Sequence, residues 1–137
     1  MKKILIVLAS LAAVMAIFFI SCNSSTTSKA SMERGEKIYT QYCLSCHQAN
    51  GSGVPQLNPP LKNTSYVLGE ESRLIRIVIN GFSDGVEING EVYTNPMPAF
   101  GASLKDEEIA DVLTYVRNSF GNKASEISAD QVKALRK

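Results

Sequence analysis

Five consecutive residues, Cys43-Leu44-Ser45-Cys46-His47, constrain this chain more than any other feature. Two cysteines that are separated by two residues and followed by a histidine are typical of a site where a haem is covalently attached. The spacing suits the chemistry, because each thiol adds to one of the two vinyl groups of a haem and the adjacent imidazole then lies over the iron. We therefore predict that Cys43 and Cys46 attach one haem and that His47 binds its iron.

Two other readings of the motif are weaker. A structural zinc site needs four ligands, whereas the 137-residue chain has a single histidine and only one further cysteine, Cys22, which lies in a segment that we expect to be processed. A thioredoxin-like redox pair follows a strand in a βαβ pattern, and the residues before Cys43 have a helical pattern instead.

The N-terminus has the layout of a secretory signal. Lys2 and Lys3 precede an uncharged, mainly apolar run over 4–20, which ends at Ser21-Cys22. A basic start, an apolar middle and a small residue at the end predict a signal peptide over 1–21 and an exported domain. Because the run is long for a signal core, an uncleaved N-terminal membrane helix is the alternative.

Ser21-Cys22 resembles the lipobox of bacterial lipoproteins, in which cleavage occurs before the cysteine and that cysteine carries the lipid. The family usually has leucine three places before the cysteine, and this chain has Phe19. A lipid on Cys22 would also explain an odd cysteine in an exported protein. Residues 22–31, rich in Ser and Thr, then form a lipid-anchored polar tether.

The charge balance argues against nucleic acid as a partner. Beyond residue 21 the chain has 12 Lys and Arg against 13 Asp and Glu, without a basic cluster. Proteins that bind nucleic acid carry a basic patch or stripe. We therefore expect no nucleic acid among the partners of this chain.

The remaining sequence predicts mainly helices. Apolar spacing and end signals place them at 32–43, 65–68, 70–79, 105–120 and 129–136. Ser31 is predicted to cap the first helix, Asn80-Gly81 to end the third, and Ser128 to open a capping box in the last. The glycines and prolines of 48–64 predict a loop that covers the haem.

A short hairpin is predicted ahead of a second candidate ligand. Asn89-Gly90 lies between two β-prone runs over 86–93, which is a strong signal for a type I′ turn. Pro96-Met97-Pro98 follows. Flanking prolines restrict the backbone on both sides of Met97 and so limit the freedom that a ligand loop loses on folding.

Met97 is the candidate for the sixth iron position. His47 is the sole histidine, and two of the four methionines lie in the predicted signal peptide. Met32 precedes the attachment motif, at the start of the predicted first helix. Haem iron paired with His and Met is typical of electron carriers. The alternative is that Met97 is an ordinary core methionine.

Together these motifs resemble the class I c-type cytochromes, the small monohaem electron carriers of bacterial periplasms and respiratory membranes. The resemblance rests on Gly35 and Tyr39 in the first helix, Cys43, Cys46 and His47 at the attachment site, Met97 before Pro98, and Tyr115 in the helix over 105–120. It implies an all-α cytochrome c fold with three to five helices around one covalently bound haem c and a small β-hairpin before the Met ligand loop. The cytochrome c domain spans 32–121, and 122–137 form a C-terminal extension with a short helix.

The resemblance also implies details of packing. The first helix and the helix over 105–120 cross at Gly35, with the aromatic residues beside it. A proline carbonyl accepts the second ring N–H of the proximal histidine, and by position Pro59 or Pro60 supplies it. We favour Pro59; simple stiffening of the loop is the alternative role for both prolines.

The function implied is the transfer of single electrons between respiratory or periplasmic redox partners, such as a dehydrogenase, a reductase or a terminal oxidase, without enzyme activity. An apolar shell drawn from Leu61, Ile75, Val78 and Phe100 would favour Fe(II). Two alternatives stay open: a haem enzyme or sensor with an open iron position, acting on peroxide or nitrogen oxides, and a structural subunit of a larger redox complex. We expect an exported, membrane-anchored bacterial protein that faces the periplasm or the cell exterior.

Overall fold

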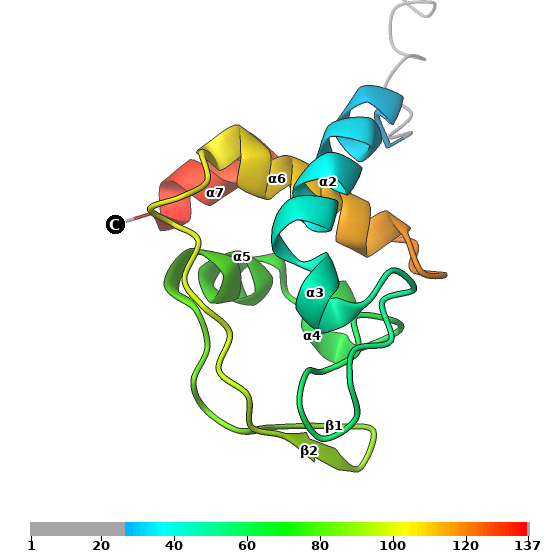
Figure 1. The fold of residues 1–137 in the computed structure, drawn as a ribbon. Helices are drawn as coiled ribbons and strands as arrows, with labels where there is room; N and C mark the ends of the chain where they lie inside the picture. The colour runs from blue at the N-terminus through cyan, green and yellow to red at the C-terminus, as the bar shows by residue number, and fades with distance from the viewer. Residues whose placement is uncertain (1–26, 137) are drawn as a thin grey trace, which may run out of the picture.

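The computed structural model describes residues 27–136. The predicted signal peptide, Cys22 and the first half of the predicted tether lie outside these residues. The described part contains six helices and one two-stranded antiparallel sheet (Figure 1): α2 Lys29–Tyr42, α3 Leu44–His47, α4 Ser65–Leu68, α5 Glu71–Asn80, β1 Val86–Ile88, β2 Glu91–Tyr93, α6 Asp106–Asn118 and α7 Ala129–Leu135. The predicted all-α class with a small hairpin is confirmed. The helix beyond the expected three to five is α3, which the attachment motif itself forms.

Helices α2 and α6 cross at Gly35. A Cβ atom at Gly35 would lie only 2.2 Å from the backbone oxygen of Asp111 and 2.7 Å from Cβ of Tyr115. The ring centroids of Tyr39 and Tyr115 lie 5.5 Å apart beside this crossing, within the range of favourable aromatic pairs. Glycine is therefore required for the two backbones to approach, as the family resemblance implies.

The predicted start of the first helix is wrong. Helix α2 begins at Lys29 after Ser28, so the last three residues of the predicted tether are helical. Ser31 is buried within the helix, and its hydroxyl donates a hydrogen bond to Oδ1 of Asp111 at 2.6 Å. Arg34 donates from Nε to Oδ2 of the same carboxylate at 2.5 Å. Ser31 thus binds Asp111 of α6 and does not cap the helix, although the local pattern predicts a cap.

The main core is centred on α6, which packs against α2 and also contacts α5 and α7. Ile75, Ile109 and Val132 are at most 1% exposed there. The hairpin has a separate small cluster, in which Val86, Ile88 and Tyr93 are buried with the partly buried Tyr66 and Phe82 packed against them. The space between the two clusters is therefore bounded by apolar side chains on both sides.

Three predicted turns and caps are confirmed. Asn89 and Gly90 have φ angles of 55° and 81°, which a type I′ turn requires at both central residues. Helix α5 ends at Gly81, whose φ is 77°. Ser128 and Gln131 form a reciprocal capping box at the start of α7.

The C-terminal extension is fixed to the helices by a buried guanidinium. Arg117 of α6 is 3% exposed and donates to the Val67 carbonyl at 2.7 Å and to the Ser125 carbonyl at 3.0 Å. It also pairs with Glu71 of α5 at 3.2 Å. One buried charge on α6 thus joins the segment 67–71 to the C-terminal extension. No helix among residues 27–136 is both long and apolar enough to cross a membrane.

Candidate functional site

The attachment motif forms one wall of an apolar pocket. Helix α2 ends at Cys43, and the His47 amide donates to the Cys43 carbonyl at 2.9 Å to close the short turn of α3. Cys43 and Cys46 are free thiols, and both line the pocket together with His47. Burial, with a smaller contribution from Cys46, raises the pKa of the Cys43 thiol to about 11. The thiol therefore keeps its proton at neutral pH when no haem is attached.

The His47 ring is oriented by a backbone carbonyl. Nδ1 of His47 lies 2.9 Å from the carbonyl oxygen of Pro59, the contact that the family resemblance implies. A carbonyl only accepts, so Nδ1 carries the hydrogen and Nε2 keeps a free lone pair. Burial lowers the pKa of His47, and the Pro59 contact opposes this effect. The ring is thus neutral and has one nitrogen available to a metal, as a haem ligand must.

The loop over 48–64 folds back on this wall. The Gly53 amide donates to the His47 carbonyl at 3.0 Å. Gly53 has a φ of 67°, and a Cβ there would lie 2.2 Å from the Asn58 carbonyl oxygen, so glycine is needed for the tight return. The far end of the loop is held by the buried Asn122, which donates to the Leu61 carbonyl at 2.9 Å. The predicted covering loop is therefore an ordered part of the pocket.

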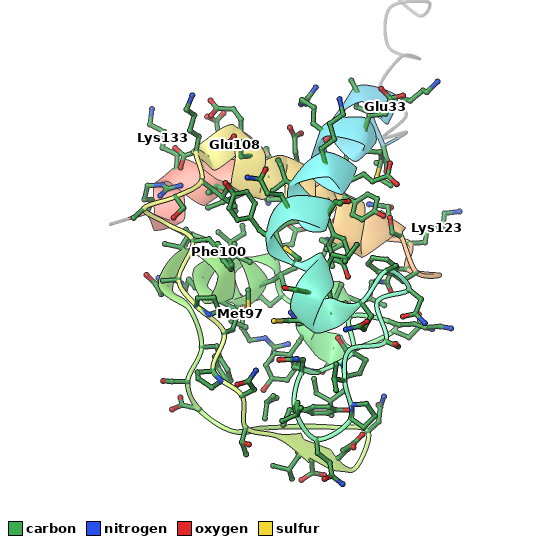
Figure 2. All side chains as sticks on the ribbon, in the orientation of Figure 1. Glu33, Met97, Phe100, Glu108, Lys123 and Lys133 are labelled. Atoms are coloured by element: carbon green, nitrogen blue, oxygen red, sulfur yellow. The ribbon has the colours of Figure 1, made fainter. Side chains whose placement is uncertain are left out.

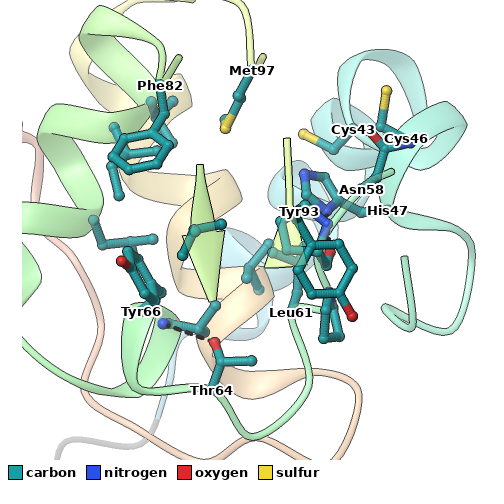
Figure 3. Close-up of a pocket in the computed structure, with 18 of the residues that line it drawn as sticks. Cys43, Cys46, His47, Asn58, Leu61, Thr64, Tyr66, Phe82, Tyr93 and Met97 are labelled. Carbon is teal, nitrogen blue, oxygen red and sulfur yellow. Dashed lines mark hydrogen bonds between the residues drawn. The ribbon is translucent and has the colours of Figure 1, made fainter. Parts of the chain in front are cut away.

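The opposite wall carries Met97. Its backbone pairs with Phe82 in an isolated β-bridge, with N···O distances of 2.8 and 3.0 Å. Gly81 makes this approach feasible, because a Cβ there would lie 2.7 Å from the Met97 carbonyl oxygen. Figure 2 shows Met97 and Phe100 between α5 and α3, and in Figure 3 the sulfur atoms of Met97 and Cys43 point toward the space between them. The fold thus brings Met97 to the same pocket as the attachment motif.

The pocket suits a mainly apolar group. It leaves about 1250 Å³ free of protein atoms, a volume that includes the open solvent at its mouth. Its lining combines aliphatic and aromatic side chains with few polar groups: Leu61, Val67, Leu74, Ile77, Val78, Val86, Ile88, Phe100, Leu104, Val112, Leu113 and Val116 are among its members. Two thiols and one imidazole on these walls suit a covalently bound haem, and the thioether of Met97 could serve as a second axial ligand.

The predicted apolar shell is partly wrong. Leu61, Val78 and Phe100 line the pocket, whereas Ile75 is buried in the main core at 1% exposure and is not among the lining residues. Helix α5 turns Ile75 away, because neighbouring apolar residues on a helix point to different sides.

Sequence reasoning missed the aromatic lining by Tyr66, Phe82 and Tyr93. Alternation along the predicted hairpin was a usable signal for Tyr93, since Val86, Ile88 and Tyr93 share its buried face. Nothing in the spacing of Tyr66 or Phe82 indicates the pocket.

Comparison with known proteins points to one family. The cytochrome c family model matches residues 32–120. Cytochrome c-552 of Thermus thermophilus is 38% identical over 111 residues, covering 74% of this chain and 83% of the relative. Cytochrome c6 of Diacronema lutheri is 34% identical over 90 residues, covering 64% of this chain and 94% of the relative.

Longer relatives match only in part. The gluconate 2-dehydrogenase cytochrome c subunit of Pantoea cypripedii is 36% identical over 109 residues, which cover 77% of this chain but only 24% of that subunit. The match over 32–120 and the relatives of similar length both agree with the helical fold and with the apolar pocket that the attachment motif lines. The chain therefore belongs to the cytochrome c family: it is a class I c-type cytochrome, an electron carrier with one covalently attached haem c.

Proposed function

We propose that this cytochrome carries single electrons through an iron held by His47 and Met97, with the haem attached to Cys43 and Cys46. The observation that supports this most strongly is the sharing of one pocket by all four side chains, although Met97 lies fifty residues after His47. Met97 is the single methionine among the described lining residues. A low-spin iron with six protein and haem ligands exchanges electrons without binding a substrate.

The residues around the haem site influence the reduction potential of the iron. The bound haem supplies the one-electron Fe(III)/Fe(II) couple. Met97 would offer a thioether that favours Fe(II), and the apolar walls formed by Val78 and Phe100 keep water away. Pro59, through its contact with Nδ1, raises the basicity of His47 and fixes the ring plane. We expect the thioether and the apolar walls together to raise the reduction potential of the haem well above that of an exposed haem.

The proposed partners are redox proteins at a membrane. Several relatives are named as cytochrome subunits of gluconate, alcohol or fructose dehydrogenases, which favours a dehydrogenase, a reductase or a terminal oxidase as the partner here. Their encounter needs only a small and short-lived interface. On the sequence evidence, residues 1–21 direct export and a lipid on Cys22 holds the domain at a membrane surface, which raises its concentration near such partners.

Carbon monoxide separates this proposal from a haem enzyme with an open iron. The reduced wild-type protein should show no carbon monoxide adduct, because Met97 occupies the sixth position, and a redox titration should give a single one-electron wave. Rapid formation of the adduct, with a high-spin ferric spectrum, would favour peroxide or nitrogen-oxide chemistry instead.

A further inference from the structure

The last helix reaches the segment that carries Met97. Arg136, at the C-cap of α7, donates from both terminal guanidinium nitrogens, one to the Gly101 carbonyl and the other to the Leu104 carbonyl, the latter at 2.9 Å. Its Nε pairs with Oδ1 of Asp106 at 2.5 Å, at the start of α6. One side chain from the extension thus contacts three consecutive parts of the chain that follows Met97.

The same segment is fixed to α5 from its other side. The Phe100 amide donates to the Val78 carbonyl at 2.9 Å, and the Gly101 amide donates to the Ile79 carbonyl at 3.0 Å. A Cβ at Gly101 would lie 2.8 Å from the Ile79 carbonyl oxygen and 3.5 Å from an Arg136 nitrogen. Gly101 is therefore enclosed between the end of α5 and the guanidinium.

Arg136 projects from a helix that is firmly placed. Val132 of α7 is fully buried, and the Gln131 side chain donates to Glu71 of α5 at 2.5 Å. The side chain of Arg136 is 29% exposed, so its hydrogen bonds are partly shielded from water. Charge-assisted bonds in such a setting are stronger than those between neutral groups.

We propose that Arg136 is a positioning residue that holds the Met97 segment closed and so controls how readily the sixth ligand leaves the iron. The proposal rests on the ligation of Met97 proposed above. In this proposal the sulfur leaves the iron as residues 97–104 move away from the pocket, and this movement breaks the contacts with Arg136. The C-terminal extension therefore tunes ligand exchange from outside the pocket.

Imidazole binding to the ferric holoprotein measures this control. The nitrogen of imidazole takes the iron position as the Met97 sulfur leaves, and the oxidation state does not change. The observed affinity is the intrinsic affinity multiplied by the fraction of open molecules. Arg136→Gln removes the charged fork, so we expect imidazole to bind about tenfold more tightly than to the wild type.

Amide hydrogen exchange gives a second readout that needs no ligand at the iron. In Arg136→Gln, exchange of the Phe100 and Gly101 amides should speed up about tenfold, because these amides lie in the released segment. The Leu61 amide, which donates to the Gly51 carbonyl on the opposite wall at 2.8 Å, should keep its wild-type rate. A role in global stability alone would accelerate all three.

Matched variants separate the effect of the planar guanidinium of Arg136 from the effect of its positive charge. Lys133→Gln removes one positive charge from an exposed position of the same helix (Figure 2) and should behave as the wild type. Arg136→Lys keeps the positive charge but loses the planar guanidinium. It should therefore keep only part of the wild-type resistance to imidazole. Asp106→Asn leaves both carbonyl contacts in place and should change imidazole affinity less than Arg136→Gln.

The possible failures are distinguishable. If the wild type binds imidazole as tightly as Met97→Ala does, Met97 is not the ligand and the proposed ligation fails. If the wild type resists imidazole but Arg136→Gln resists it equally, or if Lys133→Gln weakens the resistance as much, the positioning role of Arg136 is overturned.

Discussion

The two walls of the haem pocket are built in different ways. The attachment wall comes from one stretch, Cys43–His47, at the junction of α2 and α3, and Pro59 twelve residues later completes it. The opposite wall places Met97 through backbone bonds with Phe82 and a segment that α5 and Arg136 hold between them. The first wall depends on local sequence and the second on the tertiary fold. Changes to the two cysteines of the first wall should therefore affect haem retention, and changes to the second wall should affect, of the iron ligands, only the sixth.

The largest effect is expected for the double variant Cys43→Ala/Cys46→Ala. Both thioether bonds would be lost, so the haem would be held only by the pocket and the iron ligands. Extraction into acidified organic solvent should then remove all the haem, whereas each single variant should keep it on the polypeptide through one bond. Haem that remains with the double variant on a denaturing gel would mean that the attachment lies elsewhere.

Met97→Ala should give the next largest effect, confined to the second wall. The haem stays attached, because the thioethers lie on the other wall, but the sixth position opens and the reduced protein binds carbon monoxide. Met32→Ala is the matched control, since Met32 lies on α2 and is absent from the described lining of the pocket. Equal reactivity of the two variants and the wild type would contradict the division between the walls.

Gly81→Ala tests the support of the second wall. Alanine at Gly81 would adopt an unfavourable φ of 77° and place Cβ 2.7 Å from the Met97 carbonyl oxygen. We expect a loss of about 3 kcal/mol in the free energy of unfolding. Gly90→Ala has a similar φ of 81° with no atom within 4 Å, so it should lose only about 1 kcal/mol. Denaturant unfolding measures both, and equal losses would show that the contact with Met97 costs nothing.

The smallest effect is expected for Tyr39→Phe, near the first wall. The Tyr39 hydroxyl donates to the Gln48 carbonyl at 2.6 Å, a bond worth about 1 kcal/mol. Burial is the main cause that raises the pKa of Tyr39 above its ordinary value of about 10. Above about pH 10 the unfolded chain loses this proton while the folded protein keeps it, so stability falls as the pH rises. Tyr39→Phe should show a shallower alkaline fall, and an unchanged slope would contradict this assignment.

The sequence predicted the elements that local signals encode. The Asn89-Gly90 turn, the end of α5 at Gly81 and the capping box at Ser128 all depend on neighbours within a few residues. The attachment motif belongs to the same class, because its chemistry lies within five residues. These features could be predicted because each is determined by residues that lie close together in the sequence.

The errors and omissions involve contacts between distant segments. The local pattern predicts Ser31 as a cap, since nothing near it in the sequence indicates the hydrogen bond with Asp111, eighty residues away. Ile75 was assigned to the haem shell because apolar character does not reveal which side of α5 faces the core. The pairing of Phe82 with Met97 and the contacts of Arg136 depend on how α5 and α7 pack, which no local pattern states.

The most direct test of the ligation by His47 and Met97 is the near-infrared absorption spectrum of the oxidised holoprotein, which contains a weak band when methionine sulfur binds ferric haem. We predict the band in the wild type and in Met32→Ala, and its absence in Met97→Ala. A wild-type spectrum that lacks the band and is high-spin would contradict the account, because the iron would then be open and Met97 would be only a lining residue.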